Sequence, residues 1–149
     1  MSDNGFRIVA LNALLVVLLG MFVGGIPLVL VVMREAYHQA PTIYLAGDYR
    51  GWMMAHLEGL LNGLLMIAIA GATRLRIMGS GKERLLVASL LVAGWGNAVA
   101  AILAPLLGVR GMIFDSDFGN DFVAALFTAA LIGSVAAMGI AIGHLVSRR

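Results

Sequence analysis

The chain has 149 residues, of which 61% are hydrophobic and 12% are charged, and its mean hydropathy is +0.97. Because a soluble domain has about 25% charged residues, this composition excludes an ordinary soluble protein and indicates a membrane protein. The absence of cysteine also excludes disulfides, thiolate nucleophiles and iron–sulfur ligation.

Four apolar runs are each long enough to cross a hydrocarbon core of about 30 Å. They lie at roughly 8–33, 51–73, 85–109 and 122–147. The first run is too long for the core of a signal peptide and lacks an A-x-A cleavage site, so we expect it to remain as the first helix. Little of the chain is left for a soluble domain. The sequence therefore predicts an all-α integral membrane protein, a four-helix bundle in which residues 1–149 form a single membrane domain.

The loop at 34–50, between the first two runs, contains the three tyrosines of the chain, Tyr37, Tyr44 and Tyr49. Aromatic side chains at this position commonly anchor a helix end at the membrane interface. Alternatively, the loop roofs an opening near His56, in which case His38 is a candidate neighbour of that opening.

The second run places His56, Glu58 and Asn62 inside an otherwise apolar segment. Ionisable groups in hydrocarbon cost roughly 2.5–3.5 kcal/mol each on insertion scales, so a helix usually carries them where they have a function. His56 has three candidate roles, which are a hydrogen-bonded packing residue, a proton carrier paired with Glu58, and the axial ligand of a haem. A metal cage made of protein side chains alone is disfavoured, because further ligands at suitable spacing are missing.

Two glycines follow His56 on the same helical face. At about 100° per residue, Gly59 and Gly63 fall within about 60° of His56. They predict a strip without side chains, over which a flat ligand could lie beside the imidazole. Glu58 and Asn62 are about 40° apart on a different face, so the second helix is expected to be central in an assembly.

The third run carries the motif Gly94-Trp95-Gly96-Asn97, with Asn97 near the middle of its span. Asn62 and Asn97 could form a hydrogen bond across the bundle, either as a contact that holds helices together or as a contact to substrate. Asn12, near the cytoplasmic end of the first run, is expected to hold helices together. His144 is expected near the membrane surface opposite His56.

The sequence also predicts a helix cap and sites of close contact between helices. Asp121 is predicted to cap the fourth helix. Three GxxxG pairs predict close approach of helices, within one subunit or between subunits: Gly20/Gly24, Gly59/Gly63 and Gly139/Gly143. Four short helices expose a large perimeter to lipid, which favours an oligomer.

The basic residues predict the orientation. Seven of them lie at the two termini and in the second loop: Arg7, Arg74, Arg76, Lys82, Arg84, Arg148 and Arg149. The opposite side has three, Arg34, Arg50 and Arg110. By the positive-inside rule we expect a multi-pass protein of a bacterial-type inner (cytoplasmic) membrane with both termini cytoplasmic. The net charge of +2 belongs to this rim and is no evidence for a nucleic acid partner.

These motifs resemble those of styrene oxide isomerase, a family of small four-helix membrane enzymes. The resemblance covers most of the chain loosely and the second and third helices strongly. It rests on Gly51-Trp52, Ala55-His56, Leu61-Asn62-Gly63, Gly94-Trp95 with Asn97, and Phe118-Gly119 with Asp121. The form His56-Leu57-Glu58-Gly59, followed by Asn62-Gly63, is similar to hydroxylaminobenzene mutase, a related membrane isomerase.

The resemblance implies a homotrimer that holds haem b near its subunit interfaces, with His56 as the axial metal ligand. It also implies that Asn62, from its own or a neighbouring subunit, helps to hold a small hydrophobic aromatic substrate. We add Asn97 as a candidate catalytic residue and Gly59 and Gly63 as candidate cofactor contacts. The candidate pocket residues are Trp52, Glu58 and Trp95. One departure from the family is Ala101, where styrene oxide isomerase has a tyrosine.

A haem with one protein ligand leaves the other axial position open, so ferric iron could act as a Lewis acid on a substrate oxygen. An aryl epoxide would then open and give an aldehyde by a 1,2-hydride shift. An arylhydroxylamine would undergo N–O cleavage and oxygen transfer to the ring, giving an aminophenol. An apolar membrane pocket would protect either reaction from water.

Two other classes of protein remain open. A small proton-coupled multidrug transporter could use Glu58 as its intramembrane proton carrier, although His56 and Asn97 would then have no purpose. A haem-carrying electron-transfer subunit would usually need two haem ligands in contact.

Overall fold

The computed structural model describes residues 1–36 and 45–147, all of whose regular elements are helical. The first rod consists of α1 (Asp3–Leu18), the π-helical turn η1 (Leu19–Gly24) and α2 (Gly25–Ala36) in direct succession. The other rods are α3 (Tyr49–Thr73), α4 (Ser80–Leu107) and α5 (Phe118–Val146). All four are long and apolar enough to cross a membrane, which confirms the expected all-helical, multi-pass architecture.

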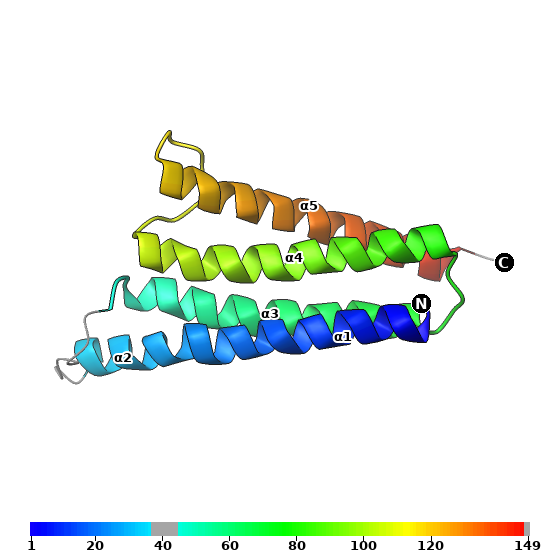
Figure 1. Ribbon diagram of the computed structural model, residues 1–149, viewed down its shortest axis with the longest axis horizontal. Helices are drawn as coiled ribbons and strands as arrows, with labels where there is room; N and C mark the ends of the chain where they lie inside the picture. Colours follow the sequence, from blue (N-terminus) through cyan, green and yellow to red (C-terminus); the bar gives the residue numbers. More distant parts are fainter. Residues whose placement is uncertain (37–44, 148–149) are drawn as a thin grey trace.

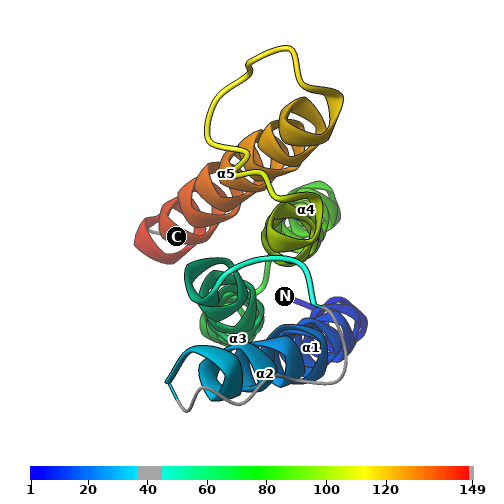
Figure 2. The ribbon, with the colours of Figure 1, turned by 90° about the vertical axis from the view of Figure 1, so that its left-hand side faces the viewer.

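The rods run alternately up and down, so the start of α1 and the end of α5 lie at the same end of the bundle (Figure 1). Figure 2 shows that α3 and α4 lie between the first rod and α5. This agrees with the contacts, because α4 packs against both α3 and α5, and α3 packs against both α1 and α4. The outer rods α1–α2 and α5 consequently expose much of their apolar surface.

Some expectations fall on residues that the structure does not describe. Tyr37, His38 and Tyr44 of the first loop, and the basic residues Arg148 and Arg149, lie outside the described residues. The expected loop roof over His56 therefore stays a prediction.

Helix caps explain where two rods begin. The first rod begins at Asp3, earlier than the apolar run, because Ser2 Oγ accepts a hydrogen bond from the Gly5 amide at 3.1 Å. The predicted cap of the last helix is wrong. Asp117 is the N-cap of α5, and its carboxylate accepts from the backbone amide of Asn120 at 2.8 Å. Asp121 lies in the first turn and accepts from the Asp115 amide instead.

The π-turn η1 lies just before Pro27, which has no backbone N–H and cannot make a regular helical hydrogen bond. In η1 the Gly25 amide donates to the carbonyl of Gly20, five residues earlier. The turn packs directly on α3, since a Cβ added to Gly24 would lie 2.7 Å from the backbone nitrogen of His56. A residue other than glycine at position 24 would therefore force the two helices apart.

The GxxxG predictions have different outcomes. A Cβ added to Gly20 would lie 2.7 Å from Gly59 Cα. The pairs Gly20/Gly24 and Gly59/Gly63 therefore bring the first rod and α3 together within the chain, which confirms the predicted close approach. Gly139 and Gly143 have no neighbour within 4 Å of an added Cβ in the described part of the chain. That face of α5 is open in the single chain.

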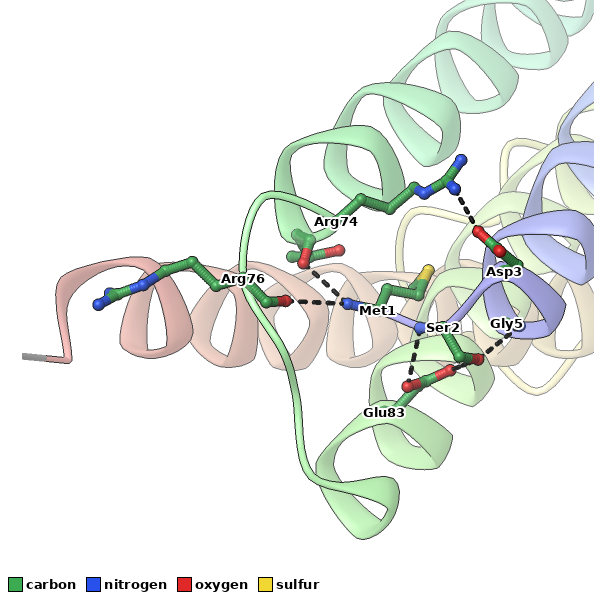
Figure 3. Close-up of polar contacts among 8 residues, drawn as sticks. Met1, Ser2, Asp3, Gly5, Arg74, Arg76 and Glu83 are labelled. Atoms are coloured by element: carbon green, nitrogen blue, oxygen red, sulfur yellow. Dashed lines mark hydrogen bonds and ion pairs between the residues drawn. The ribbon is translucent and has the colours of Figure 1, made fainter. Parts of the chain in front are cut away.

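The N-terminal residues tie the first rod to the turn between α3 and α4 (Figure 3). The Met1 ammonium donates to a carbonyl at the end of α3 at 2.9 Å. The Ser2 amide donates to Glu83 at 3.1 Å, and the Ser2 hydroxyl donates to the same carboxylate. Arg74 forms an ion pair with Asp3. These contacts fix the register of α1 against α3 and α4 at this end of the bundle.

Candidate functional site

His56 lies on α3 opposite the π-turn. Its Nδ1–H donates to the Gly20 carbonyl, with the two heavy atoms 3.0 Å apart. A carbonyl oxygen can only accept, so the proton of a neutral imidazole is on Nδ1 and the lone pair is on Nε2. This is the tautomer that binds a metal through Nε2, and a carbonyl partner on the other nitrogen is the usual support of such a ligand.

The Nε2 atom of His56 reaches the surface of the single chain. The ring is half-buried. Nε2 makes no hydrogen bond among the described residues, and no buried side-chain nitrogen or oxygen there lacks a partner. Nε2 is therefore not sealed in the bundle. Gly25 contributes to this placement, because a Cβ added there would lie 3.0 Å from Nδ1 and press on the ring.

The two glycines that follow His56 are covered by α1. A Cβ added to Gly59 would lie 2.4 Å from Gly20 Cα, and one added to Gly63 would lie 2.6 Å from the Ala13 carbonyl oxygen. The expectation of an open strip beside the imidazole is therefore wrong for the single chain. The missing side chains are used for the close approach of α1 and α3.

Glu58, Asn62 and Asn97 form one hydrogen-bonded cluster between α3 and α4. Asn62 Nδ2 donates to Glu58 Oε2 at 2.9 Å and to the Glu58 carbonyl at 2.8 Å. Asn97 Nδ2, from α4, donates to the same Oε2 at 2.5 Å. The predicted link between the two asparagines across the bundle therefore exists, but it runs through Glu58. We call these three residues the Glu58 cluster.

The Glu58 cluster lies deep in the bundle. Glu58 is nine residues from the start of α3 and Asn97 is ten residues from the end of α4, which places both about 14–15 Å along their helices. Asn62 is 8% exposed, whereas Glu58 and Asn97 are half-buried. The cluster thus lies about a third of the way along both helices, inside the apolar span, where a carboxylate needs partners.

His56 and the Glu58 cluster lie at the two edges of the outward face of α3. Their directions around the helix axis differ by about 160°, and Glu58 is paired with the asparagines and not with His56. Exposed apolar side chains occupy the face between them: Met54, Leu57, Leu61, Leu64 and Leu65. Within one chain, the imidazole and the cluster do not point at a common space.

The two tryptophans are packing residues in the single chain. Trp52 is 1% exposed in a cluster with Val31 and Ala101, and its Nε1–H donates to the Ala46 carbonyl at 2.7 Å. Trp95 Nε1–H donates to Asn12 Oδ1 at 2.9 Å, which links α4 to α1. The predicted packing role of Asn12 is thereby confirmed.

Other candidate groups lie far from His56. His144 is at the opposite end of the bundle, where its Nε2 lies 3.3 Å from the Arg76 carbonyl. A groove of about 510 Å³ lies at that same end, beside Ser2 and Glu83, and includes neither His56 nor Glu58. Within residues 1–36 and 45–147, no three His, Asp or Glu side chains gather so that they could hold a metal ion.

The carbonyl that positions His56 was not among the predicted site groups. The run Gly24-Gly25-Ile26-Pro27 was the available signal, because a proline that cannot complete the helical bond pattern favours a local irregularity in the preceding turn. π-turns of this kind are frequent at functional sites.

Comparison with known families gives one match. The model of the family described as styrene oxide isomerase matches residues 6–146, which is nearly the whole chain. No curated protein matches the chain.

Proposed function

The chain belongs to the styrene oxide isomerase family, and from this we propose that it is a haem b-dependent membrane isomerase that rearranges a small aromatic substrate. The family name alone favours an aryl epoxide, converted to an aldehyde, as the substrate, whereas the Glu58 cluster of this chain favours an arylhydroxylamine. The observation that carries the proposal is His56, whose Nδ1–H is held by the Gly20 carbonyl while Nε2 remains free at the chain surface.

The residues present fit a haem. His56 would be its single protein ligand, through Nε2, and the hydrogen bond from Nδ1 to Gly20 would fix the ring plane and raise the basicity of Nε2. Ferric haem with one protein ligand supplies a Lewis acid for a substrate oxygen, with no net redox change. The apolar side chains between His56 and Glu58 would exclude water from the reacting carbon.

The substrate site would be completed by a second copy of the chain. His56 and the Glu58 cluster lie at opposite edges of the outward face of α3, so one chain cannot present both to one small molecule. In the homotrimer that the resemblance implies, Asn62 and Asn97 of one subunit would hold the polar atoms of a substrate beside His56 of the next. The exposed apolar face of α3 would then be covered by protein.

The orientation is part of the proposal. The start of α1 and the end of α5 lie at one end of the bundle (Figure 1), and that end carries Arg74, Arg76, Lys82 and Arg84. This supports an inner-membrane protein with cytoplasmic termini.

A second candidate is the rearrangement of an arylhydroxylamine to an aminophenol. One observation favours it, which is that the Glu58 cluster uses most of its N–H donors internally and offers mainly acceptors. An epoxide oxygen cannot donate to such groups, whereas the N–H and O–H of an arylhydroxylamine can.

The visible spectrum of the detergent-purified protein tests the proposal. We expect a Soret band that His56→Ala removes, because the iron loses its only protein ligand. His144→Ala is the matched control, since this imidazole lies at the other end of the bundle, and we expect it to keep the band. Absence of a Soret band in protein from haem-supplied cells would overturn the proposal and favour a transporter that uses Glu58.

A further inference from the structure

Three of the four side-chain amide N–H donors in the Glu58 cluster already donate to Glu58. A side-chain amide has two N–H donors, and Asn62 directs both of them to Glu58, one to the carbonyl and one to Oε2. Asn97 directs one N–H to the same oxygen. Asn62 can therefore interact with a further group only through its acceptor Oδ1, and Asn97 has one donor left.

Glu58 determines this orientation of Asn62. Rotating the Asn62 amide by 180° would place Oδ1 against the Glu58 carbonyl and Oε2, where three acceptors would face one another with no hydrogen between them. Such an arrangement loses two hydrogen bonds and leaves polar groups unpaired in an apolar span, which is costly. As long as Glu58 is in place, the carbonyl side of the Asn62 amide points away from it.

The Glu58 cluster also has oxygen acceptors that no described residue satisfies. Glu58 Oε1, Asn62 Oδ1 and Asn97 Oδ1 have no partner among the described residues. Since no buried side-chain oxygen in this part of the chain lacks a partner, these oxygens reach the chain surface. Hydrocarbon cannot satisfy them at this depth, so they need a group that brings hydrogen-bond donors.

We propose that Glu58 is a positioning residue that sets substrate specificity: it holds the amides of Asn62 and Asn97 so that the site presents acceptors to an aromatic substrate whose reacting heteroatom carries hydrogen. This proposal rests on the proposed function and names its substrate class as arylhydroxylamines in preference to aryl epoxides. An arylhydroxylamine has an N–H and an O–H donor, whereas an epoxide oxygen has only lone pairs. A site built to accept such donors rejects an analogue that lacks them.

The corresponding reaction needs no co-reactant. The N–O bond breaks, a C–O bond forms on the ring, and the ring carbon loses a proton while nitrogen gains one. Nitrogen is reduced by two electrons and the ring carbon is oxidised by two, so the aminophenol has the same formula as the arylhydroxylamine.

Competing substrates test this role. The detergent-purified protein is assayed with phenylhydroxylamine and with styrene oxide, and the ratio of the two kcat/KM values is compared between wild type and Glu58→Gln. We expect wild type to favour phenylhydroxylamine at least about tenfold, and Glu58→Gln to lower the ratio by about 10- to 100-fold, because hydrogen bonds to charged groups contribute this much. The Soret band should be unchanged, since this substitution leaves the contact of His56 with Gly20 in place.

Glu83→Gln is the matched control. Glu83 also accepts two hydrogen bonds, both from Ser2, at the far end of the bundle. A loss of stability alone would lower turnover of both substrates equally and leave the ratio unchanged, which is the expected result for this variant. If Glu58→Gln does not assemble, Asn97→Ala replaces it, with an expected fall of about tenfold.

The outcomes separate this proposal from the proposed function. An unchanged ratio in a variant of Glu58 or Asn97 with an intact Soret band would overturn the specificity role alone. A wild type that prefers styrene oxide would do the same. A protein without a His56-dependent Soret band would overturn the proposed function and, with it, this proposal.

Discussion

The tight crossing of α1 and α3 leads to a sharp prediction for Gly59→Ala. The new Cβ would lie 2.4 Å from Gly20 Cα and 3.1 Å from the Val16 carbonyl oxygen, both backbone atoms that no rotamer change can move. Since carbon atoms pack at about 3.5–4.0 Å, the helices must separate by about 1 Å. Overpacking of this kind costs about 1–3 kcal/mol.

The same separation of α1 from α3 would also disturb His56, the candidate haem ligand. The bond from His56 Nδ1 to Gly20 is 3.0 Å long, and an increase of about 1 Å would break it, with a further loss of about 1 kcal/mol. We therefore expect Gly59→Ala to reduce the free energy of unfolding by about 2–4 kcal/mol. Thermal melting in detergent measures the loss of stability, and the position of the Soret band reports the changed support of His56.

Gly139→Ala is the matched control for this prediction. An added Cβ at Gly139 meets nothing within 4 Å in the described part of the chain, so alanine should stabilise the helix by up to about 1 kcal/mol through its higher propensity. A melting temperature of Gly59→Ala equal to or above that of wild type would contradict the tight crossing of α1 and α3.

Two further predictions concern packing and capping. Ala101→Tyr, which introduces the residue that the resemblance implies at this position, should destabilise the protein by about 1–3 kcal/mol, because Ala101 is 3% exposed in the buried cluster with Trp52 and a phenol there would overpack it; a melting temperature equal to wild type would contradict this packing. Asp117→Ala should cost about 1 kcal/mol by removing the N-cap of α5, measured by melting. Asp121→Ala should cost less, and a larger loss there would mean that Asp121 is the cap.

The architecture could be predicted from the residues alone, because the free energy of membrane insertion depends on the length and hydropathy of each run. Four apolar runs predicted four spanning helices, and the structure has them. The pairs Gly20/Gly24 and Gly59/Gly63 predicted close helix approach, since glycine removes the side chains that would prevent it. The polar residues His56, Glu58 and Asn62 were recognisable as candidates because their cost in hydrocarbon is independent of the fold.

The partners of these residues could not be predicted, because they depend on how the helices pack against one another. The choice of Gly20 as the acceptor for His56 depends on the π-turn and on the register of α1 against α3. The link from Asn62 to Asn97 through Glu58 depends likewise on how α3 and α4 are rotated against each other. Helical periodicity fixes the relative directions of side chains on one helix, but rotation and register between helices result from the packing of whole faces, which no local pattern contains.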